Sequence, residues 1–310
     1  MILSFPFHKK FGLISWVVIL LTFVPQLSNS QIIDNRTGKA FQEEMFFNQQ
    51  FLWQNKIKSI TGVVSIKRPN RPIESRPDLI IYHFNEVGLL RRLDKVTSVL
   101  QLVDSLTIEY KRNDLGEVNL REENNNRGVF TTQMNYDSEG RLIRLDFGKA
   151  ENVSTEKGKI VESAPIIINS ESFAWSSGDK GVARRSNFNN YGLNYSNVTI
   201  TKNEMNWLVS EVEELVMSGR TSTKKYTYNE QVWIDKIEIN DNLGGPNKSE
   251  KFYYDKLGNL VKAEYSVAGK LVREIEVLYT KTLLIEAFLD HDLQSNDILI
   301  TKFAYEYHNK

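Results

Sequence analysis

A short phrase recurs along this chain: an aromatic residue, then Asn or Asp, then two variable residues, then Gly. The first three copies begin 52 residues apart, since 136 − 84 = 52 and 188 − 136 = 52. A fixed period indicates a fold built from repeated units, and it assigns most of the Tyr, Asp and Gly residues a structural role. The clearest copies are Phe84 to Gly88, Tyr136 to Gly140, Phe188 to Gly192 and Tyr254 to Gly258.

The phrase has a physical interpretation as a tight turn. Asn and Asp side chains bond their own backbone and start turns, and Gly adopts positive φ at no steric cost. Short runs rich in aromatic and β-branched residues flank the turns, such as Lys251 to Tyr254 before one and Leu142 to Phe147 after another. Runs of this composition are typical of strands. Each repeat is therefore predicted to be a strand, a tight turn and a returning strand.

Stacked in order, such repeats predict an all-β fold. We expect an antiparallel meander over residues 54–310, forming a curved open sheet or half-barrel. Residues 31–53 contain Phe41, Met45, Phe51 and Leu52 near helical spacing, which indicates a short amphipathic helix capping one end of the sheet. Residues 205–217 fit a helix and a strand about equally by period, and the surrounding meander favours the strand.

The first thirty residues have the layout of a secretory signal peptide. Lys9 and Lys10 are basic, residues 11–24 form an apolar run, and Ser28-Asn29-Ser30 supplies small residues for cleavage before Gln31. The expected organisation is a signal peptide at 1–30, a helical cap at 31–53 and a β-sheet domain at 54–310. The expected location is outside the inner membrane: periplasm, outer surface or secreted.

Two copies of the phrase continue into a longer motif. Tyr136 to Leu142 and Tyr254 to Leu260 both read Tyr-Asp-x-x-Gly-x-Leu. This pattern resembles the YD repeat of the Rhs family, in a short exported form like those of Bacteroidetes-type bacteria. The resemblance covers most of residues 80–280 and implies a long β-sheet, but it implies little about activity.

Composition and motifs narrow the function classes. After signal cleavage the chain carries 37 basic and 39 acidic residues, a balance that argues against nucleic acid as partner. No Cys is present, no HExxH, phosphate-loop or GxSxG motif occurs, and we predict no catalytic, cofactor-binding or metal residues. Asp290-His291-Asp292 is the densest group of potential metal ligands, but neighbours on a strand point to opposite faces. Asn240 to Gly245 resembles part of a calcium loop and lacks its closing Glu, so both segments are interpreted as turns.

The remaining features indicate a binding role without naming a ligand. The leading hypothesis is a non-enzymatic binding or scaffold module at the bacterial cell envelope, with a protein, peptide or glycan as partner and no stable membrane span after cleavage. Ten of the aromatic residues in this part of the chain would form either core or an exposed stacking surface: Phe173, Trp175, Tyr191, Tyr195, Trp207, Tyr226, Tyr228, Trp233, Tyr253 and Tyr254.

Two alternatives stay open beside the binding hypothesis. One is a carboxylate-based glycan hydrolase. The other is an outer-membrane β-barrel, whose strands should alternate with apolar residues outward. In residues 271–279 one face would carry Arg273 with Ile275 and Val277, and a charge on that face argues against contact with lipid.

Overall fold

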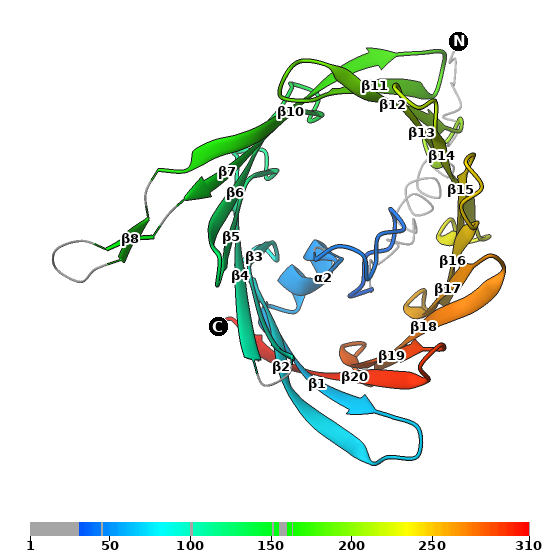
Figure 1. The fold of residues 1–310 in the computed structure, drawn as a ribbon. Coiled ribbons are helices and arrows are strands. Elements are labelled where there is room, and N and C mark those ends of the chain that lie inside the picture. Colours follow the sequence, from blue (N-terminus) through cyan, green and yellow to red (C-terminus); the bar gives the residue numbers. More distant parts are fainter. Residues whose placement is uncertain are drawn as a thin grey trace, which may run out of the picture.

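The computed structural model is a ring of antiparallel strands around an N-terminal segment (Figure 1). It describes residues 31–44, 46–99, 102–150, 152–154, 160–162 and 164–309. The predicted signal peptide lies outside the described residues. The elements of the first half are α2 (Gln49–Gln54), β1 (Ile57–Lys67), β2 (Ile73–Phe84), β3 (Leu90–Val99), β4 (Leu102–Arg112), β5 (Val118–Asn125), β6 (Gly128–Tyr136), β7 (Leu142–Ala150), β8 (Asn152–Ser154), β9 (Ile160–Glu162) and β10 (Ile166–Ser177). The second half comprises β11 (Val182–Phe188), β12 (Asn194–Lys202), β13 (Leu208–Leu215), β14 (Thr221–Tyr228), β15 (Ile234–Asp241), β16 (Lys248–Tyr254), β17 (Leu260–Val267), β18 (Lys270–Tyr279), β19 (Ile285–Asp292) and β20 (Asp297–Tyr307).

The sheet is closed, which corrects the expected open sheet or half-barrel. Its 18 strands follow one another in chain order, β10 pairs with β7, and the last strand, β20, pairs with the first, β1. The closing pair extends over the full length of β1, from Ile57 opposite Tyr307 to Lys67 opposite Ile298. Closure removes both free edges of the sheet. The β8–β9 hairpin forms a separate two-stranded sheet that projects away from the ring (Figure 1).

The all-β, antiparallel, repeat-built prediction is confirmed, and the ambiguous residues 205–217 contain strand β13. The predicted helix is shorter than expected, because only Gln49–Gln54 are helical. The segment before α2 forms turns and a single bridge between Ile33 and Phe47, and it lies inside the ring with α2 (Figure 1). We call residues 31–56 the plug.

The repeated phrase forms the same turn each time. The Asn or Asp side chain accepts hydrogen bonds from the backbone N–H two and four residues later; Asp255, for example, accepts from Leu257 at 2.8 Å and Asn259 at 2.9 Å. The fourth residue of the turn, counted from the Asn or Asp, has positive φ, as at Gly258. Because consecutive strands are antiparallel, seven of these turns lie at one end of the barrel, called the turn end. They begin at Asn85, Asn113, Asp137, Asn203, Asn229, Asp255 and Thr280.

The aromatic residue of the phrase also has a defined role. Next to each turn the strand register shifts, as between Tyr253 and Tyr254. The Tyr254 hydroxyl then donates to the carbonyl of Ile234, at the start of the neighbouring strand, at 2.8 Å. This satisfies a carbonyl near the shift that would otherwise lack a partner. Hydroxyls of Tyr136, Tyr228, Tyr279 and Tyr305 make the same bond at 2.8 Å, to Val118, Leu208, Leu260 and Ile285.

The core of the protein lies in the lumen. Strand residues that contact the plug define the inward face, and alternation along each strand then defines the outward face. Ile32, Ile33, Phe46, Phe47 and Leu52 of the plug join one continuous apolar cluster with inward strand residues. These strand residues are Ile57, Ile60, Tyr82, Phe84, Leu90, Leu93, Ile108, Tyr110, Val118, Tyr226, Ile234, Ile237, Phe252, Leu260, Ala263, Val277 and Ile285.

The outward face carries many charged side chains. On β17 and β18, Lys262 pairs with Glu264 at 2.9 Å and with Glu274 at 2.7 Å. The Tyr253 hydroxyl of β16 donates to Glu264 at 2.7 Å. Arg273 belongs to the opposite, inward face, where its guanidinium binds Asp290. The charge that seemed to face lipid therefore points into the lumen, and the face that does point outward carries Glu274 and Glu276.

Candidate functional site

The candidate site is the lumen, where the plug meets the inner wall. The plug folds back on itself, because Asp34 N–H donates to the Phe46 carbonyl at 2.6 Å and Asn48 N–H donates to the Ile32 carbonyl at 2.8 Å. At Gly38 the backbone, with φ of +72°, approaches the Ile237 side chain so closely that a Cβ would overlap it. Both the positive φ and the lack of space for a Cβ favour Gly at this position.

Polar bonds fix the plug to the wall at three places. Asn35 Nδ2 donates to the Tyr254 hydroxyl at 3.0 Å, and Gln42 donates to the buried Glu250 carboxylate. Glu44 accepts from the Tyr110 hydroxyl at 3.3 Å and lies within 4 Å of the Lys95 and Arg121 side chains. The plug is thus attached through side chains as well as through apolar packing.

Burial shifts the pKa of several groups at this interface. Burial raises the pKa of Glu250, so the carboxyl holds its proton more tightly than in water. Burial also raises the pKa of Tyr254 to about 12 and, together with the nearby Glu44 charge, raises that of Tyr82. Burial opposes ionisation of Asp34 as well, but hydrogen bonds from Arg36 hold the pKa of Asp34 below its ordinary value.

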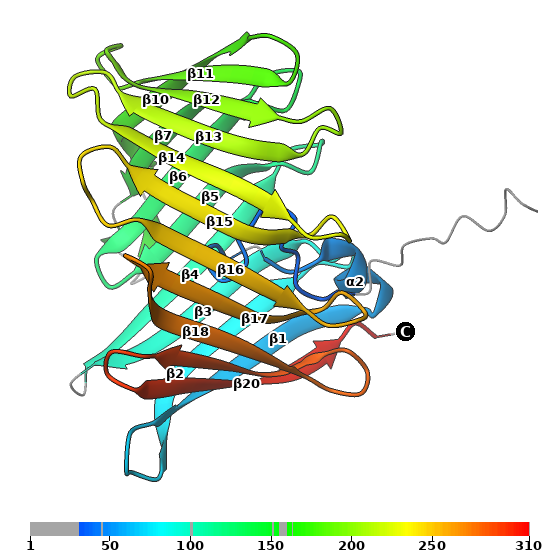
Figure 2. The ribbon, with the colours of Figure 1, turned by 90° about the vertical axis from the view of Figure 1, so that its right-hand side faces the viewer.

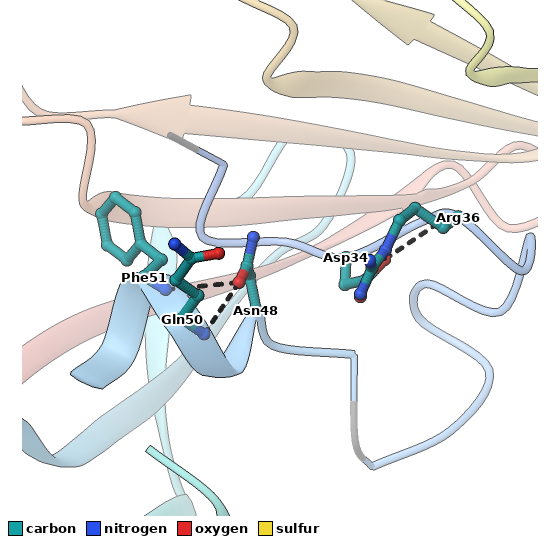
Figure 3. Close-up of polar contacts among 5 residues, drawn as sticks. All are labelled: Asp34, Arg36, Asn48, Gln50 and Phe51. Atoms are coloured by element: carbon teal, nitrogen blue, oxygen red, sulfur yellow. Dashed lines mark hydrogen bonds and ion pairs between the residues drawn. The ribbon is translucent and has the colours of Figure 1, made fainter. Parts of the chain in front are cut away.

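A first recess of about 610 Å³ lies at the turn end, between α2 and the Asn85 turn. Figure 3 shows the Asp34–Arg36 ion pair on one side and the start of α2 on the other, where Asn48 Oδ1 accepts from Gln50 N–H at 3.0 Å and Phe51 N–H at 3.2 Å. The Gln49 side chain donates to the Val87 carbonyl at 3.2 Å. Apolar side chains such as Leu52, Trp53 and Val87 line the recess together with the polar groups engaged in these bonds.

A second cavity, the inner chamber, lies between the plug and β1–β3 and β18–β20, with a volume of about 370 Å³. Its wall is aromatic: the Phe41 and Phe288 ring centroids are 5.3 Å apart at 87°, and those of Phe288 and Phe303 are 4.7 Å apart at 73°. Phe41 belongs to the plug and has φ of +65°. A bulky residue in this backbone region is an outlier and costs conformational energy.

A third cavity of about 510 Å³ adjoins the inner chamber, and we call it the mouth. The two share Arg273, Asp290 and Leu299 in their walls. The mouth is lined in part by the β19–β20 turn, at the barrel end opposite α2 (Figure 2). Arg273 binds Asp290 through two hydrogen bonds of 2.8 and 2.7 Å, a bidentate charge-assisted pair.

The segments singled out in the sequence are separated in the fold. Asp290 points inward to Arg273, while His291 faces outward and contacts Asn296. Within the described part of the chain, no group of three or more His, Cys, Asp and Glu side chains could hold a metal ion. Asp241 binds Arg220 and accepts from Leu243 N–H, as expected of a turn.

The aromatic residues are divided between core and surface. Tyr226 and Tyr254 are inward, Tyr253 is outward, and Tyr191 is 81% exposed in an isolated turn. They form no continuous exposed row. The inward carboxylates of Asp290 and Glu250 both have hydrogen-bond partners, Arg273 and Gln42. No local pattern predicts the inner chamber: Phe288 and Phe303 meet within the β19–β20 hairpin, but Phe41 reaches them only because the plug lies inside the ring.

Comparison with known proteins adds little. No protein-family model and no curated protein matches the chain. Among solved structures it is similar to a porin-like protein from Bacteroides uniformis, at 9% identity and a TM-score of 0.38 over 81% of this chain and 97% of that one. It is also similar to a porin-like protein from Bacteroides vulgatus, at 7% identity and a TM-score of 0.32 over 81% and 98%.

A third match is the structure TcdB2-TccC3-TEV, at 10% identity and a TM-score of 0.20, covering 76% of this chain and 22% of that one. Scores this low carry no functional argument, and the YD-repeat family stays a resemblance. Of the helices in the described residues, none has the length and apolar character needed to cross a membrane.

Proposed function

We propose that this chain is an exported β-barrel of the bacterial envelope, closed around its own N-terminal segment and acting as a non-enzymatic binding or scaffold protein. The observation that carries the proposal is the division of side chains between the two faces of the wall. Apolar residues gather in the lumen where the wall meets the plug, beside a few inward ion pairs such as Arg273 with Asp290, and the outward face carries charged networks such as Lys262 with Glu264 and Glu274. This is the arrangement of a barrel in water rather than in lipid.

The outward charges allow the free-energy cost of placing this wall in lipid to be estimated. A Lys or Arg facing lipid at the bilayer midplane costs ~2–4 kcal/mol, and acidic residues cost less. Lys262, Glu264 and Glu274 form one cross-strand network on β17 and β18. Lys236 and Glu238 form another pair on the outward face of β15. Several such groups on neighbouring strands interrupt the apolar band, ~25 Å tall, that an outer-membrane barrel presents.

An outer-membrane β-barrel is the second candidate, and the closed ring favours it. Closure of all 18 strands agrees better with this alternative than with the open scaffold expected from the sequence. Transmembrane sheets must be closed because free edges cannot be hydrated in lipid. The two candidates share the envelope location and differ in what surrounds the wall.

Fractionation of the native host separates them. Envelope membranes are washed with alkaline carbonate, with a known integral outer-membrane barrel of the same host as control. Release of the protein while the control stays in the pellet is the expected result. Retention with the control, together with strands protected from protease in intact membranes, would instead establish the membrane barrel.

A further inference from the structure

The inner chamber and its mouth have features that the proposed function does not use. The chamber is walled by Phe41, Phe288 and Phe303, with Ile80 and Ile275 beside them. Phe41, Ile80, Phe288 and Phe303 pack against the core and Ile275 is buried. The chamber volume of about 370 Å³ lies in the range typical of small-molecule pockets. We propose that this lumenal cavity binds a single-chain amphiphile, with its apolar tail in the inner chamber and a cationic head in the mouth.

The backbone of the plug supports the apolar end of this assignment. Phe41 adopts φ of +65°, a left-handed conformation that is strained for an L-residue. That conformation directs the ring edge-on to Phe288, where it becomes part of the chamber wall. Strained residues of this kind concentrate at ligand-binding positions, where the surrounding structure holds them in place. Filling the chamber with a tail would remove apolar surface of Phe41, Phe288 and Phe303 from water.

Charge selects the head group. Two ion pairs lie at the junction of the chamber and the mouth, Arg273 with Asp290 and Arg76 with Asp78 at 2.6 Å. Beyond them Asp292 and Asp297 occupy directly opposite positions on β19 and β20. Like charges in this position repel each other. Arg273, opposite Asp292 on β18, is already bound to Asp290, so the mouth holds three carboxylates, those of Asp290, Asp292 and Asp297, against the guanidiniums of Arg76 and Arg273. A cationic head between the two carboxylates would offset the repulsion, whereas an anionic head would add to it.

The cavity lies in the lumen, so ligand binding there does not depend on whether the barrel resides in water or in a membrane. Binding is measured with the purified protein and the neutral fluorophore N-phenyl-1-naphthylamine. Two competitors of equal chain length, dodecyltrimethylammonium and dodecanoate, are compared below their micellar concentrations. We expect saturable fluorescence enhancement, displaced by the cation at a concentration at least about tenfold lower than by the anion.

Variants on one strand localise the site. Leu299 lies where chamber and mouth meet, and Leu299→Trp should weaken fluorophore binding by at least about tenfold. Ile300→Trp is the matched control, because Ile300 is the next residue and faces outward; it should bind as the wild type does. Thr301→Phe, which narrows the chamber from the same strand, replaces Leu299→Trp if that variant fails to fold.

Asp297→Asn tests the head group and should reduce the preference for the cation severalfold. The assignment is overturned if wild-type protein shows no saturable binding, if the anion competes as well as the cation, or if the inward and outward variants bind alike. Because the fractionation experiment measures location and this one measures occupancy, each can fail without the other.

Discussion

Docking of the plug against the turn end can be tested at one glycine. Gly88 closes the Asn85 turn with φ of +78°, and α2 lies directly against it. A Cβ at this position would overlap the Gln49 carbonyl oxygen and lie 2.9 Å from the Trp53 backbone nitrogen. Both atoms belong to backbone, which cannot move aside as a flexible side chain can. Gly88→Ala should therefore displace α2 from the turn.

Gly116 is the matched control, because it closes the next turn at the same end with φ of +83° and has open space around it. Gly116→Ala carries the strain of an L-residue in this region, ~1–2 kcal/mol. Reduced freedom of the unfolded chain offsets about 0.4–1 kcal/mol of that strain, so the net loss should be roughly 1 kcal/mol. Gly88→Ala adds an overpacking cost of ~1–3 kcal/mol at the plug, for a total of roughly 2–4 kcal/mol.

Urea unfolding followed by far-UV circular dichroism gives the two free energies. Limited proteolysis of the native state then reports on the plug itself. We expect cleavage within residues 31–56 to accelerate in Gly88→Ala and to stay at the wild-type rate in Gly116→Ala. Equal losses of stability and unchanged proteolysis in both variants would refute the docking of α2 on the Asn85 turn.

Three further substitutions test other parts of the same argument. Tyr254→Phe removes the hydroxyl that donates to the Ile234 carbonyl and accepts from Asn35, so urea unfolding should show a loss of ~1–3 kcal/mol for the two bonds. Glu250 has a pKa raised by burial, so its contribution to stability is fully present below the unfolded-state pKa and is lost as pH rises through the folded-state value. Glu250→Gln lacks this titration and should therefore gain melting temperature relative to wild type as pH rises from the unfolded-state pKa of Glu, about 4.3, through the raised folded-state value; a constant difference would contradict it. Gly140→Val places a β-branched residue at φ of +73° and should cost roughly 1–2 kcal/mol or more, and an unchanged melting temperature would count against that turn.

The turns could be predicted from sequence because their signal is local. Asn or Asp followed by Gly predicts both the side-chain bond and the positive φ, and of the seven turns at the turn end four begin with Asn and two with Asp. The prediction was incomplete where the signal is weaker. Val232 takes φ of +68° in the turn begun by Asn229, so the hydrogen bonds of the turn hold a β-branched residue in a conformation that Gly prefers.

The predicted repeat, a strand, a turn and a returning strand, is present, but the 52-residue spacing is not its length. Turns at the turn end recur at about half that distance, since 229 − 203 = 26 and 255 − 229 = 26, so the unit is a single hairpin. The copy at Phe188 lies at the opposite end of the barrel, because β11 runs away from the turn end. The β8–β9 hairpin inserts extra residues after β7 and shifts the phase, and a pattern search counts residues without knowing strand direction.

Closure and the contents of the lumen depend on long-range pairing that no local pattern contains. Ile60 pairs with Tyr305 across nearly the whole chain, and this contact alone decides between an open sheet and a ring. Alternation along β18 correctly grouped Arg273 with Ile275 and Val277, but it could not say which face was inside. Contact with the plug decides which face of the strand is inside the barrel. Since Ile237 and Phe288 contact plug residues, the apolar face turns inward and Glu274 turns outward, which makes the plug the element that gives the wall its polarity.

A barrel of 18 strands is wide enough to leave a channel when empty. Here the same N-terminal residues that cover its apolar face also leave the inner chamber beside them, so the shape of any ligand site in the lumen is set jointly by the wall and by the chain's own first residues.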